Sequence, residues 1–313
     1  MKKLILFTFL LFLFFQQGNL KAQGFNKKNR YTSIGGSINA MNYVGDLDPG
    51  PSFLSPGIIF TRENLGVEIV QRMWPRVSLR GSAGWGIVKG DDKHAGYAVK
   101  NIHRTMRGLN FRSQIIEVKF DVVVDLWENR GKFQKRPDYT PYFFGGINYF
   151  HMNPKGKAPD GHYVALRPLH TEGPNHTYSL NQIAIPIGLG FRYKLSKSLD
   201  LAFEMGWRFT LTDHLDDCGG PYANPIGDST TVSLSNIMAD RSFEAYQNDP
   251  TLRAQIASNS YNNAPVTDSH GTHLNGYGRA GDKRADKNRD WYIVTGFHLT
   301  YILPGKVICP KFR

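Results

Sequence analysis

The segment TDHLDDCGG, residues 212–220, gathers five side chains that could do chemistry within six positions. They are Asp213, His214, Asp216, Asp217 and Cys218. Carboxylate, imidazole and thiolate groups are the common protein ligands of zinc, but their order here matches no recognisable ligand spacing. The pattern of an EF-hand calcium loop is also absent from the sequence. We therefore predict polar contacts that anchor a loop, with a metal site as the alternative.

A second candidate lies in SINAMNYVGDLDP, residues 37–49, where Asp46 and Asp48 follow a strand-like alternation. Two nearby carboxylates can serve as a general acid and a general base. A Gly-Asp sequence beyond a strand is also the ordinary composition of a surface turn, which is the interpretation we adopt. The histidines show no HExxH pair, and GWGIVKG is not a phosphate loop. The sequence thus predicts no enzyme, no catalytic residue, no metal and no cofactor.

In the segments that flank these candidate residues, large apolar residues alternate with small or polar ones, which is the period of a β-strand. The alternation is clearest over residues 182–195 (QIAIPIGLGFRYKL). One face is large and apolar, and the other holds small or charged residues. Such strands are long for a globular protein, where roughly five to six residues is usual. Comparable segments run over residues 31–43, 57–73, 76–88, 110–127, 140–153, 182–195, 198–212 and 290–303. In the second segment Arg62, Glu63 and Asn64 interrupt the pattern, so we expect a bulge or an excursion beyond the bilayer there.

These two faces suit a small transmembrane barrel, because lipid accepts the large side chains and the narrow interior accepts the small ones. The links alternate between short and long, as they do when turns lie on one side of a membrane and loops on the other. The longest link spans residues 213–289 and carries no pattern that predicts structure. The sequence predicts an all-β fold, an eight-stranded antiparallel transmembrane up-and-down β-barrel over residues 23–303, with short periplasmic turns and long outer loops.

Charged residues share the inward face of the predicted strands. They are Arg80, Glu117, Lys119, Asp121, Asp125, Arg192, Lys194, Glu204 and Arg208. An eight-stranded barrel is just wide enough for its own side chains to fill it. An unpaired buried ion costs several kcal/mol, so we predict that these groups form a salt-bridged plug. The alternative is an ion or proton path through the barrel.

The first residues predict export. Residues 1–3 are basic, residues 4–15 are almost entirely apolar, and Ala22 offers a small residue at a cleavage point. The apolar run is too short to span a bilayer comfortably, so residues 1–22 are predicted to be a signal peptide. Its removal takes away three lysines and no acid, which lowers the formal net charge from +12 to +9. We predict the outer membrane of a Gram-negative bacterium, with both termini in the periplasm and no nucleic-acid partner.

The two cysteines, Cys218 and Cys309, would lie on opposite sides of the membrane. An apolar band of about 25 Å separates the two sides. A disulfide allows a Cα separation of roughly 7 Å at most, so these cysteines cannot pair within one chain. Cys309 would be a free thiol or would form an intermolecular disulfide with another protein.

Five stretches of the chain together resemble a known family. They are NYVGDLDP (42–49), RVSLRGSAGWGIVKGDD (76–92), GLNFRSQIIEVKF (108–120), FTLTDHLDDCGGPY (209–222) and DWYIVTGFHLTYILPGKVICPKF (290–312). They resemble the PorG family, the outer-membrane β-barrel component of the type IX secretion (gliding/Por) apparatus of Bacteroidetes. The resemblance runs through most of the mature chain, but the long link at 213–289 cannot be mapped onto it.

The resemblance implies a non-enzymatic role in protein secretion. PorG-like proteins associate with a periplasmic ring of a lipoprotein, PorK, and its partner PorN, and tie that ring to the outer membrane. The turn at 128–138 and the tail at 304–313 would then face the ring. The expected partner-binding residues are Arg130, Lys132, Lys135, Arg136, Lys306, Cys309, Lys311 and Arg313. Such a basic rim suits an acidic protein surface, and headgroups of the bilayer and of lipopolysaccharide are an equal alternative.

Two other functions remain open from the sequence. The first is a general small outer-membrane barrel that acts in adhesion or envelope integrity through its large outer loop. The second is an acyltransferase at the outer rim or a narrow channel.

Overall fold

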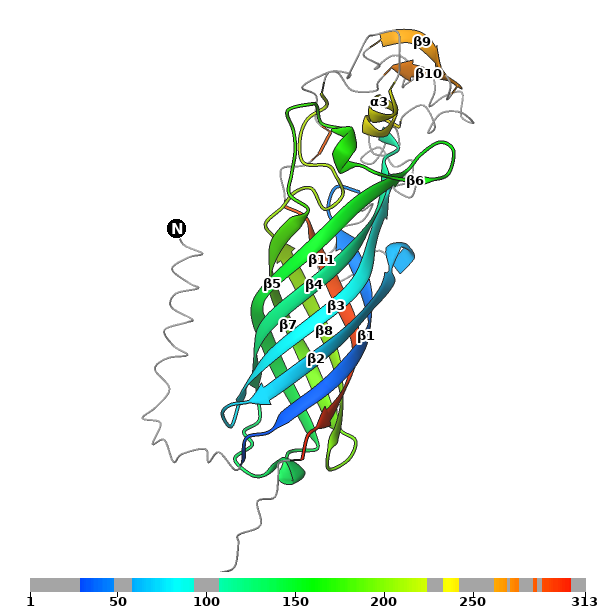
Figure 1. Ribbon diagram of the computed structural model, residues 1–313. Coiled ribbons are helices and arrows are strands. Elements are labelled where there is room, and N and C mark those ends of the chain that lie inside the picture. Colours follow the sequence, from blue (N-terminus) through cyan, green and yellow to red (C-terminus); the bar gives the residue numbers. More distant parts are fainter. Residues whose placement is uncertain are drawn as a thin grey trace, which may run out of the picture.

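The computed structural model describes residues 29–47, 58–92, 107–223, 233–241, 262–268, 271–275, 284–285 and 289–304. Its main feature is a tall, closed β-barrel with folded loops at one end (Figure 1). The predicted signal peptide and Asp48 lie outside the described residues. So do the tail residues Lys306, Cys309, Lys311 and Arg313. No helix in the described part of the chain is long and apolar enough to cross a membrane.

Eight strands form the barrel wall. They are β1 (Thr32–Val44), β2 (Arg62–Arg72), β3 (Val77–Asp91), β4 (Asn110–Asp125), β5 (Tyr139–Lys157), β7 (Asn181–Lys194), β8 (Leu199–Thr210) and β11 (Trp291–Ile302). Each pairs antiparallel with the next wall strand along the chain, and β1 pairs with β11 to close the barrel. The prediction of an eight-stranded antiparallel up-and-down barrel is therefore confirmed.

The two faces of the wall have opposite chemistry. In β4, Glu117, Lys119 and Asp121 are buried inside the barrel, whereas Val118 and Phe120 between them are more than half exposed on the outside. The same outward band continues around the barrel. It includes Ile38, Val67, Ile147, Ile185, Phe203 and Phe297. Exposed apolar side chains over this height are favourable in lipid, so the architecture is that of an outer-membrane barrel.

The links alternate in length as the sequence predicts. Residues 73–76, 126–138 and 195–198 connect strands at one end, which we call the turn end. Residues 45–61, 92–109, 158–180 and 211–290 connect strands at the other, which we call the loop end. The 126–138 turn contains the short 3-10 helix η5 (Phe133–Lys135).

The expected bulge in the second strand is wrong. Residues 62–64 pair with residues 39–41 of β1 without a shift in register, and β2 begins at Arg62 rather than at residue 57. Before it, η2 (Ile58–Phe60) is a 3-10 helix. The polar residues fit the ladder because Asn64 points inward, where its Oδ1 accepts a 2.8 Å hydrogen bond from Nδ2 of Asn39.

Loop segments fold over the loop end as a cap, which comprises residues 158–180, 211–223, 233–241 and 284–285. It contains β6 (Tyr163–Ala165), η6 (Arg167–Leu169) and α3 (Leu234–Ala239) (Figure 1). β6 pairs antiparallel with the last residues of β5. A separate hairpin, β9 (Asn262–Asp268) with β10 (Gly271–Asn275), also belongs to the link that the sequence left without structure. In the cap, Leu166, Leu215 and Met238 join strand residues such as Phe111 and Phe150 in one apolar core.

Candidate functional site

Arg80 of β3 is the centre of an ionic network inside the barrel. Its Nη2 lies 3.0 Å from Oδ2 of Asp121 on the neighbouring β4. Its Nη1 bonds to Glu204 of β8 across the barrel and lies 3.6 Å from Oε2 of Glu68 on β2. Tyr142 of β5 donates a 2.6 Å hydrogen bond to the same Glu204. One guanidinium thus connects carboxylates from three strands.

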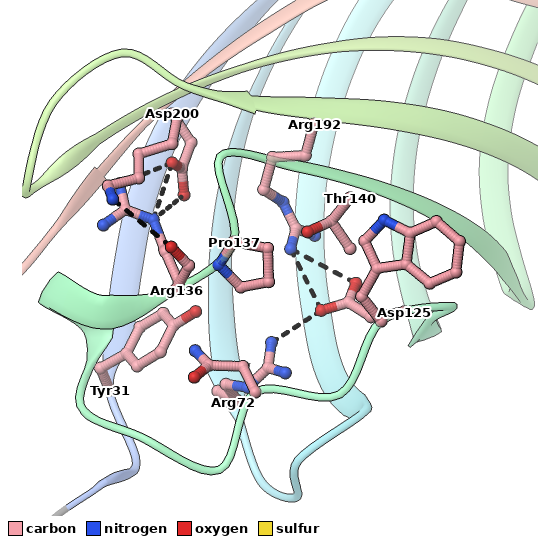
Figure 2. A pocket seen from close by; sticks show the side chains of 11 residues that line it. Tyr31, Arg72, Asp125, Arg136, Pro137, Thr140, Arg192 and Asp200 are labelled. Carbon is pink, nitrogen blue, oxygen red and sulfur yellow. Dashed lines mark hydrogen bonds and ion pairs between the residues drawn. The ribbon is translucent and has the colours of Figure 1, made fainter.

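A second group lies toward the turn end. Oδ2 of Asp125 on β4 is 2.7 Å from Nη1 of Arg72 on β2 and 3.3 Å from Nη1 of Arg192 on β7 (Figure 2). Arg72 also donates to the carbonyl of Pro75, in the turn that follows β2. The carboxylate therefore joins strands on opposite walls.

A third group, nearer the loop end, is paired less closely. Oε2 of Glu117 accepts hydrogen bonds of 2.9 Å from Tyr292 and 2.8 Å from Asn148. The cations stay farther away, with Nζ of Lys119 at 3.8 Å and Nε of Arg208 at 4.0 Å. Nε and Nη1 of Arg208 have no hydrogen-bond partner among the described residues. Arg208 is consequently a buried cation with weak compensation.

Two aromatic rings fill the space between these groups. Phe144 lies under the guanidinium of Arg80 and Tyr142 under that of Arg192, each at 4.7 Å from guanidinium carbon to ring centroid. The rings extend toward β7, where a Cβ at Gly190 would come within 2.3 Å of the Tyr142 ring. The small inward face of β7 therefore makes room for aromatic side chains from β5.

Two cavities inside the barrel are small. One of about 10 Å³ lies at the turn end (Figure 2), and one of about 30 Å³ lies deeper, beside Arg80 and Glu204. A single water needs roughly 10–15 Å³, so the two cavities hold about one water and about two to three waters respectively. The barrel interior around these two cavities is therefore filled by side chains, with room for a few isolated waters.

Arg136 corrects one expectation about the basic turn. It is buried, with Nη2 lying 2.6 Å from Oδ1 of Asp200 on β8 (Figure 2). Its other donors bond to the carbonyls of Phe133, Ser196, Lys197 and Leu199. All three guanidinium nitrogens are therefore bonded within the chain, which sets Arg136 apart from the exposed bases of the turn. Arg136 attaches the 126–138 turn to the β7–β8 turn.

The other bases of this turn remain accessible. Arg130, Lys132 and Lys135 are exposed, and Arg130 lies 3.0 Å from Glu128 on the same turn. Lys194, expected in the interior network, lies instead at the turn end, where its Nζ is 3.2 Å from Asp138. Of the charged residues predicted to face the barrel interior, Lys194 therefore lies at the turn end, and the others lie inside the barrel.

The loop end holds a buried acid cluster in which Asp46 corrects a second expectation. Asp46 lies in a turn, as the sequence predicts, but the turn is buried and not at the surface. Nearby, the hydroxyl of Tyr43 is within hydrogen-bond distance of two carboxyl groups, at 2.7 Å from Oδ2 of Asp216 and 2.9 Å from Oδ1 of Asp290. Burial raises the pKa of Asp216 and that of Asp290, and the neighbouring carboxylates, including Asp46, raise both further. The cluster can therefore keep protons that surface carboxyl groups lose.

The rest of the 212–220 segment anchors the cap. Asp217 accepts 2.5 Å hydrogen bonds from the hydroxyls of Thr171 and Tyr178. Cys218 is a buried free thiol whose pKa burial raises. Its expected separation from Cys309 stays a prediction, because residue 309 lies outside the described residues.

Several interior partners were missing from the predicted set. They include Glu68, Arg72, Tyr142, Asn148, Asp200, Tyr292 and His298, all of them buried. Nδ1 of His298 lies 3.1 Å from Oε2 of Glu68 and its Nε2 lies 3.6 Å from Oε2 of Glu204. The signal that identifies these residues is strand parity, since each lies an even number of positions from other inward-facing residues of its own strand.

Comparison with solved structures finds other outer-membrane barrels. The outer membrane protein OprG from Pseudomonas aeruginosa is 10% identical, with 88% of this chain and 98% of that chain covered and a TM-score of 0.38. A major outer membrane protein from Thermus thermophilus is 10% identical, with coverages of 87% and 99% and a TM-score of 0.35. Neisserial surface protein A is 8% identical, with coverages of 87% and 96% and a TM-score of 0.34.

No curated protein matches the chain. One family model does match, over residues 5–238, which is most of the chain and reaches from the first residues to α3. The chain therefore belongs to the family described as "Domain of unknown function (DUF6089)".

Proposed function

We propose that the protein is a structural component of a type IX secretion machine, which holds the periplasmic ring at the outer membrane through its turn end. The observation that carries the proposal is a basic turn fixed in place beneath a filled barrel. The motif resemblance described above supplies the identity of the machine. In this arrangement the turn end and both termini face the periplasm.

The filled interior supports a structural role over transport. Arg80, Asp121 and Glu204 bond across the lumen, and the cavities beside them hold only a few waters. An ion path needs a continuous aqueous route, so conductance in planar bilayers is the measurement that would favour the channel alternative. Transfer of acyl chains between lipids would favour the rim acyltransferase.

The turn end supports the choice of partner. Arg130, Lys132 and Lys135 are exposed on a turn that Arg136 attaches to Asp200, and Arg76 and Lys197 are exposed on the two adjacent turns. Exposed charges of one sign speed association with an oppositely charged surface. PorK-like and PorN-like ring proteins with acidic surfaces are the partners we propose. In the tail, Lys306, Lys311 and Arg313 would add to the same surface.

Co-purification tests the proposal. A tagged protein extracted in gentle detergent should retain the ring proteins, and the double variant K132E/K135E should lose them. The double variant K155E/K157E, with the same charge change at the loop end, should retain them. Extraction of the wild-type protein alone, or equal loss in both variants, would overturn the proposal.

Cross-linking through Cys309 gives a second test that does not depend on charge. Under oxidising conditions, a non-reducing gel should show a shifted band that contains a ring protein. Cys309→Ser should abolish the shift. Cys218→Ser should preserve it, since Cys218 is buried at the opposite end of the barrel. A shift that survives Cys309→Ser would contradict a partner contact at the tail.

The folded cap favours one second candidate, a general barrel that acts in adhesion or envelope integrity. Its core includes Leu166, Leu215 and Met238, so the loops present an ordered surface. For that function, K155E/K157E should reduce cell attachment or envelope resistance, and K132E/K135E should leave both unchanged.

A further inference from the structure

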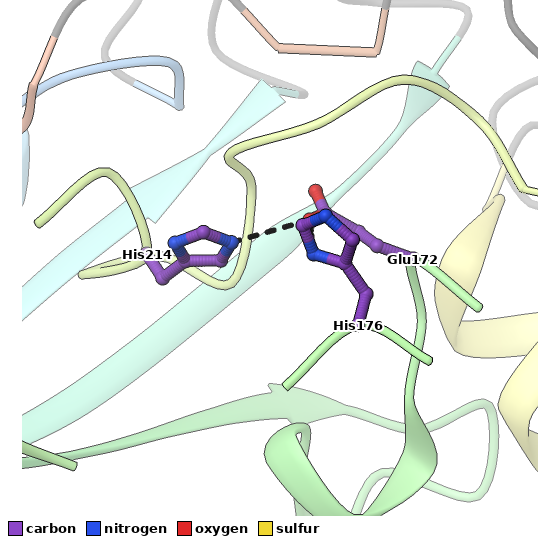
Figure 3. Close-up of side chains that lie close together, drawn as sticks. All are labelled: Glu172, His176 and His214. Carbon is purple, nitrogen blue, oxygen red and sulfur yellow. Dashed lines mark hydrogen bonds and ion pairs between the residues drawn. The ribbon is translucent and has the colours of Figure 1, made fainter. Parts of the chain in front are cut away.

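Three side chains that could bind a metal converge in the cap. Glu172 and His176 lie between η6 and β7, and His214 follows β8 (Figure 3). One carboxylate oxygen and one nitrogen from each ring lie within 4.8 Å of one another. The spacing along the chain gives no sign of this group, because its members come from two separate segments.

The carboxylate of Glu172 is held in one orientation. Its Oε1 accepts hydrogen bonds from the backbone N–H of Gly219 at 2.8 Å, from that of Gly220 at 2.9 Å and from Nη1 of Arg284 at 2.9 Å. Oε2 is therefore left to face the two imidazoles.

The contacts at Oε2, which include a hydrogen bond with His214, are long for direct ion pairs and match the spacing of ligands around a shared metal. Nε2 of His214 is 3.3 Å from Oε2 and Nδ1 of His176 is 3.4 Å from it. A charge-assisted hydrogen bond is shorter, about 2.7–2.9 Å. Ligand atoms at about 2.0–2.2 Å from a tetrahedral zinc ion lie about 3.3–3.6 Å apart. Both observed separations match an edge of that tetrahedron.

The surroundings fix His214 as well. The ring of Tyr178 stacks on it at 4.7 Å between centroids. On another side, a Cβ at Gly219 would lie 2.5 Å from the imidazole Cε1, so only glycine admits the ring there. Gly219 thus gives space to one ligand and donates its N–H to the other. In metal sites, contacts of this kind around the ligands hold the ligand side chains in orientation.

We propose that Glu172, His176 and His214 form a binding site for a first-row transition metal ion, with Zn²⁺ as the reference ion. Two imidazoles and one carboxylate suit this class, whereas Ca²⁺ and Mg²⁺ take oxygen ligands. His176 is half exposed, so its ring can move to complete the site and water can occupy the fourth position. The ion would connect the 170–176 and 212–220 segments of the cap.

Metal titration of the full-length protein in detergent tests the site. After treatment with a chelator, the wild type should bind one equivalent of Zn²⁺ in competition with a chromophoric indicator. Co²⁺ should bind at the same place and give the visible absorption of a tetrahedral complex. His176→Ala should weaken Zn²⁺ binding at least tenfold, and this variant should fold because the side chain is half exposed.

His162→Ala is the matched control. His162 is an exposed cap histidine beside an acid, with Nδ1 at 3.3 Å from Asp160, but it lies outside the cluster. Its replacement should leave Zn²⁺ affinity unchanged, and excess Ca²⁺ should not compete. Zn²⁺ should raise the unfolding temperature of the wild type and of His162→Ala, but not that of His176→Ala. No binding by the wild type, or equal affinity in His176→Ala, would overturn the proposal.

Discussion

The two halves of the barrel interior are stabilised in different ways. Toward the turn end, buried charges such as Arg80, Asp125 and Arg192 bond to partners on the wall strands themselves. Toward the loop end, residues such as Phe111 and Phe150 form an apolar core that the cap completes. The first half is closed by its own strands, and the second depends on loops that arrive from elsewhere in the chain.

The difference shows how one narrow interior uses two solutions. Long charged side chains reach across the lumen and satisfy one another, which suits a region far from any loop. At the loop end, loop residues such as Leu215 and Met238 complete the packing of apolar side chains from the strands. Substitutions should therefore affect global stability most in the ionic half and cap structure most in the apolar half.

The largest expected effect is that of Arg80→Met. The change leaves Asp121, Glu204 and Glu68 buried without their shared cation, which costs about 3–5 kcal/mol in comparable buried pairs. Guanidinium unfolding in detergent micelles, followed by tryptophan fluorescence, measures the free energy of unfolding. Arg76→Met is the matched control, because Arg76 is exposed at the turn end, and its effect should stay within about 0.5 kcal/mol.

A loss of less than about 1 kcal/mol for Arg80→Met would contradict the ionic model of this half. That result would mean that the three carboxylates are protonated or hydrated without the cation. The polar network would then occupy the interior without contributing to the free energy of unfolding through its ion pairs.

Arg136→Ala should have a somewhat smaller effect, about 2–3 kcal/mol, because it removes charge-assisted hydrogen bonds at the edge of the interior. The 126–138 turn should also detach from Asp200 and become sensitive to trypsin at Lys132 and Lys135. Limited proteolysis measures this directly. Arg130→Ala, in an exposed side chain of the same turn, should change neither quantity. Equal protease resistance in both variants would disprove the anchoring role of Arg136.

Asp290→Asn should change how stability depends on pH. Burial and the acids Asp216 and Asp46 raise the pKa of Asp290 above its usual value of 3.8. As pH rises above that value, the unfolded chain loses this proton while the folded chain keeps it, so stability falls until the raised pKa is reached. Replacing the carboxyl group by an amide should reduce the slope of the unfolding free energy against pH by up to about 1.4 kcal/mol per pH unit.

Unfolding free energies measured at a series of pH values from 4 upward test this sign. Asp138→Asn, a change in an exposed acid at the turn end, should leave the slope of the wild type unaltered. A steeper fall in Asp290→Asn than in the wild type would show that the cluster is stabilised by its charges, and that burial does not keep Asp290 protonated.

Strand parity explains how much of this could be predicted from the sequence. The alternation of β4 identified Glu117, Asp121 and Asp125 as interior groups because a strand fixes the side of every second residue. The same rule applied to β2 and β11 would have added Arg72 and His298.

Loop geometry could not be predicted in the same way. Asp46 is buried beside Arg107 and Asp216, which belong to distant segments, and Arg136 is buried because Asp200 lies beneath its turn. Neither contact leaves a periodic signal. The cluster of Glu172, His176 and His214 depends on the same kind of long-range contact.

The smallest expected effect is that of Arg208→Met, and it sharpens the comparison most. Arg208 is as buried as Arg80, but its nearest carboxylate oxygen is 4.0 Å away and two of its nitrogens lack hydrogen-bond partners among the described residues. Burial of a cation costs free energy, and weak pairing recovers little of it. Replacement by an apolar side chain of similar length should therefore change the unfolding free energy by less than about 1 kcal/mol, in either direction. A loss as large as that of Arg80→Met would mean that burial inside the barrel, rather than pairing, decides what a buried charge contributes.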